Sequence, residues 1–125
     1  MAKILVVDDE ALLAKSLSII LTKAGHTVVT AENGKMGLEV FAHENPDLVI
    51  TDIIMPEMEG IEAIQILRSQ APKLPIIAVS GGGRTKNLEF LRVAEKLGAN
   101  AALGKPFTKE QLLAAVASCL AAAGK

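Results

Sequence analysis

The chain has 125 residues, with 13 basic and 14 acidic side chains and a formal net charge of −1. This length fits one domain, and the balanced charge gives no electrostatic footprint for nucleic acid or an anionic membrane. The single cysteine, Cys119, cannot form an internal disulfide, and no apolar run reaches the length of a membrane span. We therefore expect one cytoplasmic domain over residues 1–125, with no second domain attached and with neither nucleic acid nor membrane as a partner.

Five continuous apolar runs predict the buried strands of a parallel sheet. In chain order these runs are 3–7, 27–31, 48–51, 75–79 and 101–103. Each is followed by apolar residues at spacings of three and four, which are typical of an amphipathic helix. Gly25 and Asn45-Pro46 are expected to end the first two helices, and Thr108 is expected to cap the last one. The pattern predicts a doubly wound α/β domain, a (βα)5 three-layer sandwich with helices on both faces.

Polar side chains follow four of these runs. Asp8 and Asp9 follow the first, Asp52 the third, Ser80 the fourth, and Lys105 comes shortly after the fifth. Parallel strands end at the same edge of a sheet, and ligands of such folds bind at that edge. The second run has no comparable group, which suits a strand order of 2-1-3-4-5 with that strand at the margin. We therefore expect three carboxylates, a hydroxyl and an amine to converge.

The expected cluster suits a metal-assisted reaction of a phosphoryl group. Three neighbouring carboxylates repel one another, and Mg²⁺ relieves this repulsion because it prefers oxygen ligands. With Mg²⁺ and Lys105 present, the charges of the site sum to about zero, and a phosphoryl group adds about one more negative charge. Ser80 and Lys105 supply donors for that group. The pattern indicates electrostatic preorganisation for phosphoryl transfer.

These motifs resemble those of response-regulator receiver domains over essentially the whole chain, in the stand-alone form known from chemotaxis regulators. The intervals of 43 residues from Asp9 to Asp52, 28 to Ser80 and 25 to Lys105 agree with that family. The resemblance implies a flavodoxin-like fold with sheet order 2-1-3-4-5. The matching residues are Val6–Asp9, Asp52–Gly60, Ser80 and Lys105–Phe107.

The resemblance also implies a ligand set for Mg²⁺. Asp9 and Asp52 would bind the ion directly, together with the backbone carbonyl of Ile54. Asp8 would act through a metal-bound water.

For the reaction, the resemblance implies that Asp52 accepts a phosphoryl group from a histidine. The donor would be a sensor histidine kinase or a histidine phosphotransfer protein. Lys105 would pair with the phosphoryl group, and Ser80 would donate a hydrogen bond to it. Phosphorylation would switch a face formed by the fourth helix, fifth strand and fifth helix towards a target protein. Such a domain phosphorylates and dephosphorylates itself but is not a turnover enzyme.

Ala102 departs from the family, because many receivers carry Tyr or Phe three residues before the lysine. A switch based on that aromatic ring is therefore not expected in its usual form. We expect signalling to use the Ser80 hydroxyl, the glycines 81–83 and a shift of the fourth helix instead.

Three simpler readings and two other functions remain open at this point. Asp9 could serve only as a helix N-cap, Lys105 could be a solvated loop lysine, and Cys119 is expected to pack rather than to act in redox chemistry. The chain could also be a small Mg²⁺-dependent phosphohydrolase with Asp52 as nucleophile, or a receiver-like docking module that works without phosphorylation.

Overall fold

The computed structural model describes residues 2–52, 59–80, 92, 95–96, 98–104 and 107–124. Their centre is a sheet of five parallel strands in the order β2-β1-β3-β4-β5. This is the order that the sequence predicts. The strands are β1 (Lys3–Val7), β2 (Thr27–Ala31), β3 (Leu48–Asp52), β4 (Ile76–Ser80) and β5 (Ala101–Gly104).

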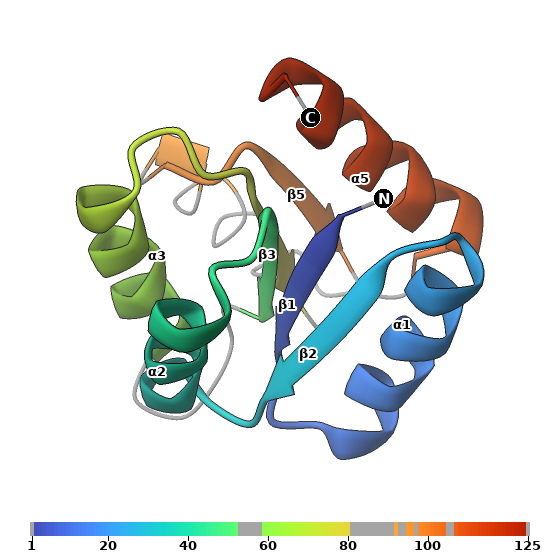
Figure 1. The fold of residues 1–125 in the computed structure, drawn as a ribbon, viewed down its shortest axis with the longest axis horizontal. Coiled ribbons are helices and arrows are strands. Elements are labelled where there is room, and N and C mark those ends of the chain that lie inside the picture. The colour runs from blue at the N-terminus through green and yellow to red at the C-terminus, as the bar shows by residue number, and fades with distance from the viewer. Residues whose placement is uncertain are drawn as a thin grey trace.

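Helices cover both faces of the sheet, so the domain has three layers. Figure 1 shows α1 and α5 against one face and α2 and α3 against the other. The predicted fourth helix falls mainly on residues outside the described part of the chain. The described helices are α1 (Ala11–Lys23), α2 (Gly34–Glu44), α3 (Glu59–Gln70) and α5 (Lys109–Ala122).

The strands are buried on both faces because successive side chains of a strand point to opposite sides. In β1, Leu5 and Val7 belong to the core cluster that includes Ile64 and Leu67 of α3. Ile4 and Val6 belong to a second cluster, which α1 and α5 complete. This double burial explains why the strands appear in the sequence as continuous apolar runs.

The helix ends follow the local signals in the sequence. Gly25, just beyond α1, has φ of 98°, and Asn45 closes α2 with φ of 52°. Both values lie in the left-handed region, which Gly and Asn tolerate better than other residues. Thr108 begins α5 with a capping box, in which its hydroxyl accepts from the Gln111 N–H at 3.0 Å. The three predicted helix boundaries are confirmed.

Arg68 of α3 forms hydrogen bonds with three segments near the amino-terminal ends of β4 and β5, opposite the edge where Asp8 and Asp52 lie. Its guanidinium donates to the carbonyl oxygen of Gly98 at 2.6 Å and 3.1 Å and to Asn100 Oδ1 at 2.9 Å. It also donates to the carbonyl oxygens of Ala71 and Pro72. Burial lowers the pKa of the guanidinium from its ordinary value. These hydrogen bonds hold the segment before β5, residues 98–100, against the C-terminal end of α3.

Two further residues from the sequence analysis lie in this framework. Cys119 is buried in α5 and packs in the cluster beneath that helix, as predicted. Ala102 is half-buried in β5 and packs against the cluster on the α2–α3 side. Within the described part of the chain, no helix has the length and apolar character needed to cross a membrane.

Candidate functional site

The strand register places Asp8 and Asp52 next to each other. Val7, which precedes Asp8, is paired with Thr51, which precedes Asp52. The Asp8 N–H donates to the carbonyl oxygen of Ala31 at 3.0 Å, so the main chain continues the sheet for one more residue. Both carboxylates are buried, with Asp8 4% exposed and Asp52 3% exposed. Asp8 after β1 and Asp52 at the end of β3 therefore lie side by side, as predicted.

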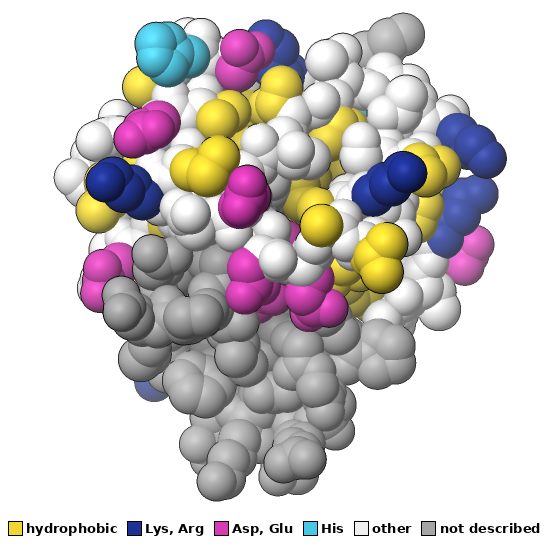
Figure 2. Space-filling model, turned by 90° about the horizontal axis from the view of Figure 1, so that it is seen from below, with side chains coloured by type: hydrophobic (Ala, Val, Ile, Leu, Met, Phe, Trp, Pro, Cys, Tyr) yellow, Lys and Arg dark blue, Asp and Glu magenta, His cyan; other side chains and the backbone are white. Residues whose placement is uncertain are grey.

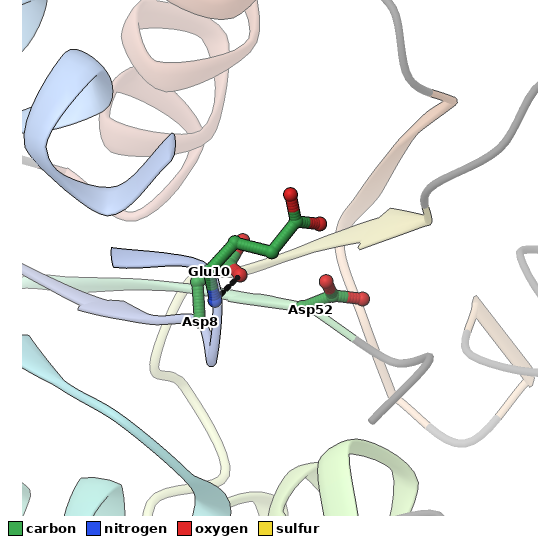
Figure 3. Close-up of side chains that lie close together, drawn as sticks. All are labelled: Asp8, Glu10 and Asp52. Atoms are coloured by element: carbon green, nitrogen blue, oxygen red, sulfur yellow. Dashed lines mark hydrogen bonds between the residues drawn. The ribbon is translucent and has the colours of Figure 1, made fainter. Parts of the chain in front are cut away.

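Glu10 is the third carboxylate of this group. Carboxylate oxygens of Asp8, Glu10 and Asp52 lie within 4.8 Å of one another. The Glu10 N–H donates to Asp8 Oδ1 at 2.8 Å, which closes a tight turn between β1 and α1 (Figure 3). The sequence analysis assigned no role to Glu10. Its position directly after two aspartates was the available signal.

Asp9 lies at the same junction but outside this carboxylate group. It is exposed, whereas Asp8 before it is buried. The N-cap residue of α1 is Glu10, with extended φ and ψ of −88° and 101°. The simpler reading of Asp9 as the N-cap is therefore wrong, and its role as a direct metal ligand stays a prediction.

The remaining predicted residues lie at or beyond the ends of β4 and β5. Ser80 is the last residue of β4 and is paired with Gly104, the last residue of β5. Lys105 follows Gly104 in the chain but lies outside the described residues, as does Ile54. Figure 2 looks onto the edge of the sheet where the strands end and shows acidic side chains gathered near its centre.

The donor set fits a hard divalent cation. Mg²⁺ binds oxygen ligands at about 2.0–2.1 Å, so oxygens on opposite sides of the ion are about 4 Å apart. Carboxylate oxygens within 4.8 Å of one another are close to that requirement. Mg²⁺ also prefers carboxylate oxygens as ligands, whereas softer metals prefer sulfur or nitrogen. Asp8, Glu10 and Asp52 could hold such an ion with small side-chain adjustments.

The fold is a doubly wound parallel sheet with an acidic group where β1 and β3 end. The response regulator receiver domain family matches residues 4–117 of the chain. The chain belongs to this family.

Known relatives include both short and long proteins. Protein PilH of Pseudomonas aeruginosa is 38% identical over 124 residues, which cover 97% of this chain and 99% of PilH. The transcriptional regulatory protein PhoP of Bacillus subtilis, which acts in alkaline phosphatase synthesis, is 36% identical over 119 residues. That match covers 94% of this chain but 48% of PhoP, so the chain spans about half the length of such relatives. Because PhoP is a transcriptional regulatory protein, the expected absence of nucleic acid among the partners of this chain stays a prediction.

Solved structures share the fold over nearly the whole chain. A CheY-like receiver domain protein from Methanospirillum hungatei has a TM-score of 0.88 at 29% identity, covering 99% of this chain and 97% of that one. A receiver domain protein from Clostridium thermocellum has a TM-score of 0.88 at 32% identity, covering 96% and 94%. The predicted fold class is confirmed.

Proposed function

We propose that this chain is a phosphorylation-dependent switch in which Asp52 accepts a phosphoryl group. The observation that carries the proposal is the position of Asp52. It ends β3 at 3% exposure, with two further carboxylates close enough to share a cation, in a chain that belongs to the receiver family. A charged group this strongly buried needs partners, which is typical of a functional site.

In the proposed reaction, a carboxylate oxygen of Asp52 attacks the phosphorus of a phosphohistidine. The P–N bond breaks, its electron pair stays on the imidazole nitrogen, and an acyl phosphate forms on Asp52. The donor is a sensor histidine kinase or a histidine phosphotransfer protein. The chain promotes one transfer to itself and the later loss of the phosphate, so we propose no turnover of other substrates.

The metal and phosphoryl ligands are proposed by residue. Asp9, Asp52 and the carbonyl of Ile54 would hold Mg²⁺, with Asp8 acting through a water. Mg²⁺ would supply positive charge that offsets the charge of the transferring group. Lys105 would pair with the phosphoryl oxygens and Ser80 would donate to one of them. Ser80 is the last residue of β4 and Lys105 comes directly after β5 in the chain, and both strands end at the same edge of the sheet as β3.

The direct test is the mass of the intact protein after incubation with acetyl phosphate, with Mg²⁺ or with EDTA. We expect one phosphoryl adduct on the wild type that requires Mg²⁺ and is absent from Asp52→Asn. Glu39→Gln is a matched control, because it removes one carboxylate from the middle of α2. An adduct that persists in Asp52→Asn would contradict the proposal.

The output is proposed to pass through the face formed by the fourth helix, β5 and α5. Ala102 in β5 carries no ring that could move, so we propose that Ser80, the glycines 81–83 and the fourth helix relay the change. Amide spectra with and without beryllofluoride test this idea. Chemical-shift changes should extend into β5 and α5, and changes restricted to the neighbourhood of Asp52 would show that the face does not respond.

A further inference from the structure

Thr51 carries a hydroxyl group that is buried in the interior of the domain, directly before Asp52. Among the residues that the structure describes, three polar or charged side chains are buried, and they are Asp8, Thr51 and Asp52. Asp8 and Asp52 belong to the acidic group at the strand ends, whereas Thr51 has had no role so far. Its exposed fraction is 0%, so its hydroxyl is separated from bulk water. A hydroxyl in such a place is costly unless it forms a hydrogen bond.

The Thr51 side chain lies on the face of the sheet that α2 and α3 cover. Thr51 is paired with Val7 of β1 and with Ala78 of β4, and both of these residues belong to the core cluster on that face. Residues that are paired across neighbouring strands carry their side chains on the same face. Valine has the same branched shape as threonine and is also favoured in strands, and it would fill this position without burying a polar group. Strand formation and packing therefore do not account for the hydroxyl.

The hydroxyl forms a hydrogen bond with the main chain of the next residue. Thr51 Oγ1 donates to the carbonyl oxygen of Asp52 at 3.2 Å. This carbonyl belongs to the peptide group through which the chain leaves β3, because Asp52 is the last residue of that strand. The pairing of β3 with β1 runs as far as Thr51, and its pairing with β4 runs as far as Asp52. The hydroxyl thus holds a peptide group at the point where strand pairing ends.

We propose that Thr51 is a positioning residue for the phosphorylation of Asp52. The inference rests on the proposed function, because it concerns how Asp52 meets the phosphoryl donor. Figure 3 shows the Asp52 side chain where β3 ends. The direction of that side chain depends on the two peptide groups that flank Asp52, and the Thr51 hydroxyl holds the second of them. The carboxylate oxygen is thereby kept in line with the phosphorus, and small misplacements of a reacting group slow such reactions strongly.

The expected effect is moderate because the hydrogen bond is long. Its length of 3.2 Å exceeds the distance of about 2.7–2.8 Å that is usual between a hydroxyl and an oxygen acceptor. Loss of the hydroxyl should slow phosphorylation about three- to ten-fold, which corresponds to the net contribution of one hydrogen bond. For the same reason the hydroxyl should add little to the stability of the fold, so the rate of phosphorylation and the stability can be separated.

The test compares Thr51→Val, which keeps the branched shape, with Thr51→Ser, which keeps the hydroxyl. The rate at which the phosphoryl adduct forms is followed by intact mass with acetyl phosphate and Mg²⁺, and melting temperatures are measured without the donor. We expect Thr51→Val to react about three- to ten-fold more slowly than the wild type, and Thr51→Ser to stay within about twofold of it. Thr51→Ser should melt about 3–6 °C below the wild type, because it leaves a methyl-sized space in the core. Thr51→Val should stay within about 3 °C of the wild type.

The carbonyl carbon resonance of Asp52 gives a readout that does not depend on phosphorylation. This resonance responds to a hydrogen bond on its oxygen, so it should shift further in Thr51→Val than in Thr51→Ser. Thr27→Val is the matched control, because Thr27 is exposed at the opposite end of the sheet, where it is paired with Lys3 at the start of β1. This control should keep the wild-type rate and the wild-type resonance of Asp52.

The outcomes separate this inference from the proposed function. A wild-type rate in Thr51→Val, with no adduct on Asp52→Asn, would overturn the role of Thr51 alone. Equal slowing in both Thr51 variants would also overturn it, because the effect would then come from packing. The same holds if Thr51→Val melts below Thr51→Ser or does not fold, since the hydroxyl would then be needed for the fold itself. A wild type that gains no phosphoryl adduct would overturn both proposals.

Discussion

Gly37 of α2 allows that helix to lie unusually close to β1, one residue before the acidic site. A Cβ atom placed on Gly37 would be 2.8 Å from Cγ2 and 3.4 Å from Cγ1 of Val7. Both residues are buried, and Val7 is 2% exposed in the core cluster on that face. Because Val7 is β-branched and directly precedes Asp8, its side chain has little freedom to move aside.

Two effects of Gly37→Ala oppose each other. Alanine in place of glycine inside a helix stabilises it by about 1 kcal/mol. Carbon atoms in contact are normally about 3.5–4.0 Å apart, and overpacking a core costs about 1–3 kcal/mol. A 2.8 Å approach to a buried, branched side chain belongs at the upper end of that range. We therefore expect a net loss of about 1–2 kcal/mol and a melting temperature lower by about 4–8 °C.

The free energy of unfolding should be measured by urea titration, followed by far-ultraviolet circular dichroism. Ala42→Gly on the exposed side of the same helix calibrates the propensity effect. A double-mutant cycle with Val7→Ala should show favourable coupling, since removal of the Val7 methyl groups makes room for the new Cβ. If Gly37→Ala proves more stable than the wild type by about 1 kcal/mol, propensity prevails and the steric reasoning is refuted.

Three other substitutions test the framework of the domain. Arg68→Lys should destabilise the fold by about 1–3 kcal/mol in urea, because an ammonium group cannot reproduce the guanidinium contacts; Arg92→Lys, at an exposed position, should be neutral. Thr108→Ala should cost about 1 kcal/mol through loss of the α5 cap, and Thr108→Ser should recover most of it. Burial raises the pKa of the Cys119 thiol above its ordinary value of 9.0, so the folded state holds that proton more tightly than the unfolded state. The protonated thiol's contribution to the free energy of unfolding is fully present below the ordinary pKa and is lost as pH rises above it. In urea titrations above about pH 9, Cys119→Ala should therefore lose less stability than the wild type. An equal loss in both proteins would contradict this assignment.

The sequence was a sufficient guide to features that depend on neighbouring residues in the chain. Gly25, Asn45 and Thr108 mark helix ends because each end needs a particular backbone conformation or a cap within a few residues. The strand order was predicted as well, from the lack of a polar group after the second run and from the resemblance to receiver domains. Asp8 and Asp52 meet at one edge of the sheet, as expected.

Only the tertiary structure showed that the carboxylate of Glu10 lies with those of Asp8 and Asp52. The sequence analysis had assigned Glu10 no role. The physical reason is that side-chain direction at a strand-to-helix junction depends on the turn, here closed by the Glu10 N–H on Asp8. The contact of Arg68 with Gly98 was equally invisible, because it joins residues 30 positions apart and depends on how the elements pack. Local chemistry thus determined the elements and their order, and packing determined which side chains meet.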